Sequence, residues 1–196
     1  MFIKILGNLD HKYVYNTLNR VKKLISTPTQ ITFYFLENLN LCYSIKLPRN
    51  LQNRFKIECN QKVSFSVKYK SKKVIVVYLN KDLQNNQKAF IGLLLHEISH
   101  IKQIDTGIYD QIYSAYNQVY PKNLKLINGL KYDKTRLKQL FSDISVMAVS
   151  TLKDIYANNY LIKNKLDSYL IEYYLSEFDR KVCPKPIFYK NLKENL

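Results

Sequence analysis

Two of the three histidines in this chain lie four positions apart in the apolar stretch LLLHEISHI, residues 93–101. Residues four apart on a helix share one face, so His96 and His100 can direct two imidazole nitrogens at one Zn²⁺ ion. Glu97 follows the first histidine and is displaced to one side, which places a carboxylate near the metal without making it a ligand. Such a carboxylate can take a proton from a metal-bound water. The spacing therefore predicts a zinc site with Glu97 as the general base.

Two other interpretations of this pattern remain open. The histidines can be buried core residues whose nitrogens bond to backbone or carboxylate groups, or they can bind a metal that performs no hydrolysis. In a chain of this composition roughly 0.001 matches to H-E-x-x-H are expected by chance, which favours a functional site.

The stretch resembles the active-site helix of the zincin metallopeptidases. That family favours uncharged residues around the motif, and Ile98, Ser99 and Ile101 fit, whereas Lys102 departs from it. The family's order of elements also resembles the order expected here over roughly residues 10–160: an N-terminal helix, a small twisted sheet, the motif helix, and a later helix with a third ligand. The resemblance implies that His96 and His100 bind zinc and that Glu97 is the base.

The third ligand is not fixed by the motif. The metzincin extension of the motif is excluded, because Gln103 and Thr106 stand at its glycine and ligand positions. No glutamate occurs between Glu97 and Glu172, which disfavours the usual gluzincin ligand and leaves the aspartates.

Asp143 is the preferred third ligand. It lies at the margin of an apolar stripe on a predicted helix, and a carboxylate placed among apolar residues is costly unless a cation pairs with it. Asp154, on the same margin, is the second choice and Glu172 the third. The alternative for Asp143 is a solvent-edge aspartate. Any of several tyrosines could donate to an oxyanion, with no basis for choosing one: Tyr109, Tyr113, Tyr116 and Tyr156.

The elements that must position these residues indicate an α+β, zincin-like fold. Apolar periodicity predicts helices over residues 11–25, 87–103, 131–160 and 165–178, and strands over 30–37, 62–70 and 73–80, the last two as a hairpin. A less certain strand pair covers 41–45 and 55–59, and residues 108–129 are expected to be loop with short helical pieces. One domain is expected: 10–103 with the N-terminal helix, the sheet and the active-site helix, 104–182 as a helical subdomain with the third ligand, and 183–196 as a polar tail.

Composition limits the partners and the compartment. The formal net charge is +16, which permits nucleic acid as a partner, although the lysines are spread along the chain. Cys42, Cys59 and Cys183 are widely spaced and are expected to be reduced thiols. No signal peptide and no membrane partner are expected, so the chain is expected to be cytoplasmic; its oligomeric state is left open.

The sequence thus predicts a zinc metallopeptidase of the metalloendopeptidase type, acting on peptide or protein substrates through a metal-bound water activated by Glu97. The alternative is a basic, nucleic-acid-associated or regulatory metal-binding protein with a zincin fold and little or no protease activity.

Overall fold

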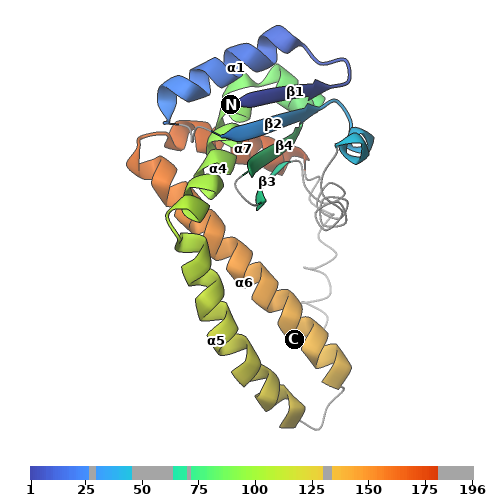
Figure 1. The fold of residues 1–196 in the computed structure, drawn as a ribbon, viewed down its shortest axis with the longest axis vertical. Helices are drawn as coiled ribbons and strands as arrows, with labels where there is room; N and C mark the ends of the chain where they lie inside the picture. The colour runs from blue at the N-terminus through green and yellow to red at the C-terminus, as the bar shows by residue number, and fades with distance from the viewer. Residues whose placement is uncertain (27–29, 46–63, 70–71, 130–133, 181–196) are drawn as a thin grey trace, which may run out of the picture.

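The computed structural model describes residues 1–26, 30–45, 64–69, 72–129 and 134–180 of the chain. It is a mixed α/β structure, mostly helical, with one small sheet (Figure 1). In chain order the elements are β1 (Phe2–Leu6), α1 (His11–Leu24), β2 (Ile31–Leu36), the 3₁₀ helix η1 (Leu39–Ser44), β3 (Ser64–Tyr69), β4 (Lys72–Tyr78), α3 (Lys81–Asn85), α4 (Gln87–Asp105), α5 (Ile108–Gly129), α6 (Lys134–Lys163) and α7 (Asp167–Arg180).

The sheet has the strand order β1-β2-β4-β3. β1, β2 and β4 run parallel, and β3 runs antiparallel to β4 with Ser64 opposite Val77. The parallel strands β1 and β2 are joined through α1, as parallel neighbours require a crossover connection. Among the described strands, β3 is the last in this order and forms one outer edge of the sheet.

Side-chain alternation along the strands gives the sheet two buried faces. Phe33, Phe35 and Ile75 point to the face covered by α1 and α4 and belong to the larger core. Tyr34 and Val76 point to the opposite face, where they pack with Cys42 of η1 in a smaller core. Strands covered on both faces are apolar on both, which explains the continuous apolar run of β4.

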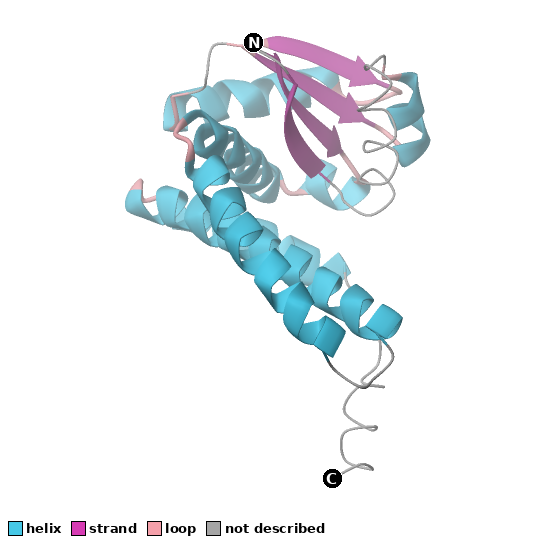
Figure 2. Cartoon of the chain, turned by 60° about the horizontal axis from the view of Figure 1, so that its bottom comes forward, coloured by secondary structure: helices cyan, strands magenta, loops and turns pink. Residues whose placement is uncertain are grey.

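The two halves of the helical region differ in burial. Every residue of α4 from Ala89 to Ile101 is buried, because the sheet, α1, α6 and α7 surround this helix. α5 and α6 instead form a long hairpin that extends away from the sheet (Figures 1 and 2), and the first half of α6 exposes large apolar side chains. The C-terminal half of α6 returns to pack on α4.

Several expectations from the sequence are confirmed, and several are wrong. The helices and the three principal strands lie within a few residues of their predicted bounds. The segment expected to be loop is the continuous helix α5, which keeps Pro121 inside it. The N-terminal strand β1 was not predicted, and residues 39–44 form a 3₁₀ helix instead of entering a strand. Residues 55–59 lie outside the described part.

One of the three cysteines differs from expectation. Cys42 is disulfide-bonded, so the prediction of three reduced thiols is wrong for this residue. The cysteines therefore do not support the expectation of a reducing compartment. Among the described residues, no helix is long and apolar enough to cross a membrane.

Candidate metal centre

The two histidines of the motif face one another across a single turn of α4. Asn86 caps this helix by accepting a hydrogen bond from the backbone N–H of Ala89 at 3.0 Å, which fixes the start of the helix and so the register of its faces. The Nε2 atoms of His96 and His100 lie 3.0 Å apart. Both side chains are buried, as expected for positions on a helix that is surrounded by other elements.

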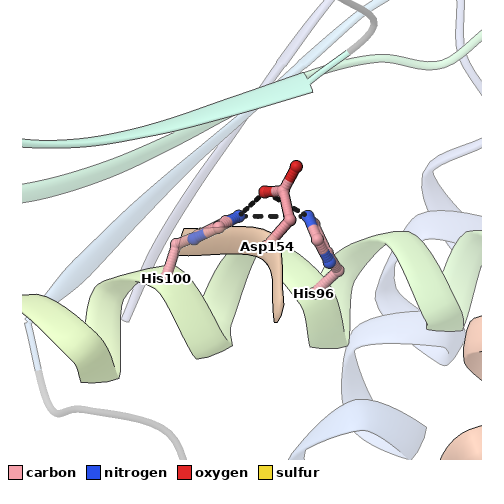
Figure 3. A group of neighbouring side chains, drawn as sticks. All are labelled: His96, His100 and Asp154. Atoms are coloured by element: carbon pink, nitrogen blue, oxygen red, sulfur yellow. Dashed lines mark hydrogen bonds and ion pairs between the residues drawn. The ribbon is translucent and has the colours of Figure 1, made fainter. Parts of the chain in front are cut away.

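A carboxylate from α6 completes the group (Figure 3). Oδ1 of Asp154 lies 3.1 Å from Nε2 of His100 and 3.7 Å from Nε2 of His96. The three ligand atoms form one compact cluster of the kind that can hold a metal ion. Asp154 is half exposed, whereas both histidine side chains are nearly covered, so solvent reaches the cluster from the side of the carboxylate.

The separations within the cluster fit a tetrahedral zinc ion. Two ligand atoms that are each about 2.1 Å from such an ion lie about 3.4 Å from one another. The observed separations of 3.0, 3.1 and 3.7 Å fall on either side of this value. Two nitrogens and one carboxylate oxygen are also ligands that zinc accepts in catalytic sites, where a fourth position stays open.

Amide side chains hold the outer nitrogen of each histidine. Oε1 of Gln103 lies 3.1 Å from Nδ1 of His100, and Nε2 of Gln103 donates to the carbonyl oxygen of Lys153 at 2.6 Å. Because a carbonyl oxygen only accepts, this bond fixes the orientation of the Gln103 amide, so its oxygen faces the imidazole. Nδ1 of His100 therefore carries a proton, and in the neutral ring the lone pair of Nε2 is directed into the cluster.

The first histidine is held in the same way. Oδ1 of Asn158 on α6 lies 3.1 Å from Nδ1 of His96. The amide nitrogen of Asn158 donates to the hydroxyl of Tyr174 on α7 at 2.9 Å. In the neutral form with a proton on Nδ1, each imidazole directs its Nε2 lone pair toward the carboxylate of Asp154, an arrangement that a proton on one Nε2 or a bound metal ion can stabilise.

The pKa values of the two histidines are shifted in opposite directions. For His100 burial lowers the pKa, but the hydrogen bond that its ring donates to Asp154 and the charge of Glu97 outweigh burial, and the net shift is upward. For His96 burial and the neighbouring His100 lower the pKa. The surroundings therefore favour a positive charge on His100 over one on His96.

Glu97 is buried beside the cluster and bonds to the sheet. Its Oε1 accepts a hydrogen bond of 2.7 Å from the hydroxyl of Ser64, the first residue of β3. It does not belong to the group of three ligand atoms. Glu97 therefore lies beside the three ligand atoms and outside their group.

The structure brings Asp154 to the histidines, and does not bring Asp143 there. Asp143 is exposed and its carboxylate accepts a hydrogen bond from Gln139 at 2.8 Å. The preference for Asp143 is corrected on this ground. It assumed burial in an apolar segment, but Leu140 and Ile144 on either side are themselves more than half exposed. Glu172, the third choice, lies near Lys88 at 3.6 Å and is also absent from the cluster.

The tyrosines near the cluster come from α7, not from the elements that were considered. The ring of Tyr173 lies 5.8 Å from that of His96, and that of Tyr174 lies 6.2 Å away. Burial, followed by the nearby charge of Glu97, raises the pKa of Tyr173, so its phenol stays protonated. The four tyrosines considered from the sequence lie elsewhere: Tyr109 and Tyr113 beside Lys153, Tyr116 beside Tyr120, and Tyr156 in the groove between α5 and α6.

Close packing of α7 on α4 permits these contacts. A side chain at Gly92 would place its Cβ 2.0 Å from the carbonyl oxygen of Tyr169, so only glycine allows the two helices to approach at this point. Sequence reasoning did not identify Ser64, Gln103, Asn158, Tyr173 and Tyr174 as parts of the site. The alternation of β3 places Ser64 on its polar face, but no pattern in the sequence shows what that face contacts.

No protein-family model, no curated protein and no solved structure matches this chain.

Proposed function

We propose that the protein is a zinc-dependent peptidase with a zincin-like fold, in which His96, His100 and Asp154 bind the metal. The observation that carries the proposal is the convergence of the three ligand atoms in one cluster with a separate buried carboxylate, Glu97, beside it. A structural role for two core histidines would not require both Nε2 lone pairs and a carboxylate to face one point.

Bound zinc would supply Lewis acidity, which lowers the pKa of water and polarises a carbonyl group. Glu97 accepts the proton from the attacking water through the carboxylate oxygen that Ser64 does not occupy. The water oxygen bonds to the carbonyl carbon, the C–N bond breaks, and Glu97 returns the proton to the leaving amine nitrogen. Tyr173, which remains protonated, donates a hydrogen bond toward the negative charge that develops on the carbonyl oxygen.

The edge strand β3 offers a way to hold the substrate. Ser64 begins this strand and contacts Glu97, so the strand passes directly beside the proposed base. An extended polypeptide can add to such an edge through backbone hydrogen bonds, which would align it with the cluster. The substrate class in this proposal is therefore an extended segment of a polypeptide.

The experiment compares Glu97→Gln with Glu172→Gln, a matched change of a carboxylate outside the cluster. Zinc content is measured by mass spectrometry, and hydrolysis is followed on casein and on a peptide library. We expect Glu97→Gln to keep its zinc while the hydrolysis rate falls at least about a hundredfold, and Glu172→Gln to retain both. Full activity in Glu97→Gln, or a purified wild-type chain without bound zinc, would contradict the proposal.

Nucleic-acid binding remains the alternative, and its test is salt dependence. A basic face beside the cluster would favour this alternative, but of the described lysines Lys73 pairs with Asp105 at 2.5 Å, and α6 begins at the far end of the hairpin from the sheet (Figure 1). Binding of a DNA or RNA duplex that weakens steeply with added salt, in a protein that hydrolyses no peptide, would favour this alternative.

A further inference from the structure

An exposed apolar strip runs along the first half of α6. It consists of Leu140, Ile144 and Met147, which are 55%, 54% and 68% exposed. Single exposed apolar side chains are ordinary, but neighbouring large ones on one helix face form a patch of the kind that contacts a partner. We call these three residues the α6 strip.

The strip continues the face of α6 that carries Asp154. Met147 and Leu140 precede Asp154 by seven and fourteen residues, and seven residues complete two helical turns to within about 20°. They therefore lie about 10 and 21 Å from Asp154 along the helix axis, on nearly the same side. The cluster also opens to solvent at Asp154, whose side chain is 50% exposed. The end of the strip at Met147 is therefore the end nearer to the solvent-exposed side of the cluster.

The strip differs in charge from the rest of the chain. The chain carries a formal net charge of +16, yet the only charged residue between positions 139 and 152 is Asp143. That carboxylate accepts a hydrogen bond from Gln139. Depletion of charge together with exposed aliphatic and methionine side chains is typical of the centre of a binding surface. The chemistry selects an apolar partner over an acidic one.

A second apolar feature of the hairpin is separate from the site. A cavity of about 460 Å³ lies between α5 and α6 and is lined in part by Val149, Leu152 and Tyr156. Leu152 lies about 160° around the helix from Asp154, so this cavity is on the opposite side of α6. It does not continue the proposed active site.

We propose that the α6 strip binds an apolar segment of the polypeptide substrate, and this inference rests on the proposed peptidase function. An extended chain advances about 3.3 Å per residue, so the strip would take side chains about three to six residues from the cleaved bond. The edge of β3 would hold the backbone near Glu97, while the strip selects sequences with an apolar block at that distance.

Binding can be measured without cleavage by using zinc-loaded Glu97→Gln protein. Fluorescence anisotropy is followed for two labelled peptides that differ only in one block of leucines replaced by serines. The double variant Leu140→Ser/Met147→Ser replaces the two strip residues that lie nearest to the face of Asp154. Val146→Ser is the matched control, because Val146 is 57% exposed but lies about 100° around the helix from Met147.

We expect the leucine peptide to bind about tenfold more tightly than the serine peptide, and the double variant to lose this difference while Val146→Ser keeps it. In protein with Glu97 intact, the double variant is expected to raise KM for the leucine peptide and leave kcat unchanged. Equal binding of the two peptides, or an equal loss in Val146→Ser, would overturn the inference.

The strip and the peptidase proposal fail with different results. Hydrolysis with an unchanged KM in the double variant would overturn the strip alone, whereas strip-dependent binding without any hydrolysis by wild type would overturn the peptidase proposal and the strip's role in binding a substrate. Sedimentation equilibrium tests whether a second copy of the chain occupies the strip instead. A dimer that dissociates in the double variant would assign the strip to a second copy of the chain and overturn the inference.

Discussion

Helices α4 and α6 both contain long apolar stretches, but α4 is buried and the first half of α6 exposes its apolar side chains. In α4 the histidine pair lies on a helix that is covered on all sides, where Ser64 of β3 bonds to Glu97 and Asn158 of α6 bonds to His96. The sheet with α1, α4 and α7 forms the body of the structure, and only the C-terminal half of α6 packs against it. The first half of α6 forms an arm of the hairpin with exposed apolar residues. The contrast between α4 and α6 shows that an apolar stripe predicts a helix, but whether the stripe is buried depends on which other elements pack against it.

The largest expected contrast concerns the free energy of unfolding. Leu94 on α4 is fully buried and Leu140 on α6 is 55% exposed. Leu94→Ala should destabilise the protein by about 3 kcal/mol through a lost apolar contact and a cavity, and Leu140→Ala by less than about 0.5 kcal/mol. Urea denaturation followed by circular dichroism measures both. Equal losses would mean that the hairpin is as closely packed as the body.

Zinc affinity separates the two aspartates of α6. Asp154→Ala should raise the zinc Kd by more than about a hundredfold, since it removes one of the three proposed ligands, whereas Asp143→Ala should leave the Kd within about threefold. Competition with a chromophoric chelator gives both values. A larger loss in Asp143→Ala would restore the sequence-based choice of ligand and would require a different arrangement of α6 on α4.

A substitution at Gly92 tests how closely α7 packs on α4 beside the histidines. Gly92→Ala places a methyl group against the carbonyl oxygen of Tyr169 and should destabilise the protein by about 2 kcal/mol, because α7 must move away from α4. Gly107→Ala is the comparison: nothing lies within 4 Å of its Cβ position, but its φ of +73° is unfavourable for alanine, so a loss of about 1 kcal/mol is expected. Thermal unfolding measures both, and a neutral Gly92→Ala would contradict the close approach.

The smallest expected effect concerns the support of His100. Gln103→Leu keeps the size of the side chain but removes the acceptor for Nδ1, and the zinc Kd should rise about tenfold. Gln139→Leu on the exposed arm makes the same chemical change next to Asp143 and should leave the Kd unchanged. Titration with zinc by calorimetry distinguishes the two. An unaffected Kd in Gln103→Leu would mean that the amide does not orient the ring.

Local patterns in the sequence were sufficient for most helices, for the strands β2, β3 and β4, and for the histidine pair with its adjacent glutamate. These features depend on residues within a few positions of each other, where helical and strand periodicity determine which side chains share a face. The continuous helix α5 was missed because its tyrosines, polar residues and Pro121 resemble a loop, while packing against α6 stabilises it as a helix.

Only the tertiary structure decided which carboxylate meets the histidines. Asp143 and Asp154 are eleven residues apart, which is three turns to within about 20°, so a helical wheel places them on the same face and cannot distinguish them. They differ by about 16 Å along the axis, and the height at which α6 crosses α4 selects Asp154. That height follows from long-range packing among α4, α6 and α7, and the same packing brings Asn158 and Tyr173 to the site.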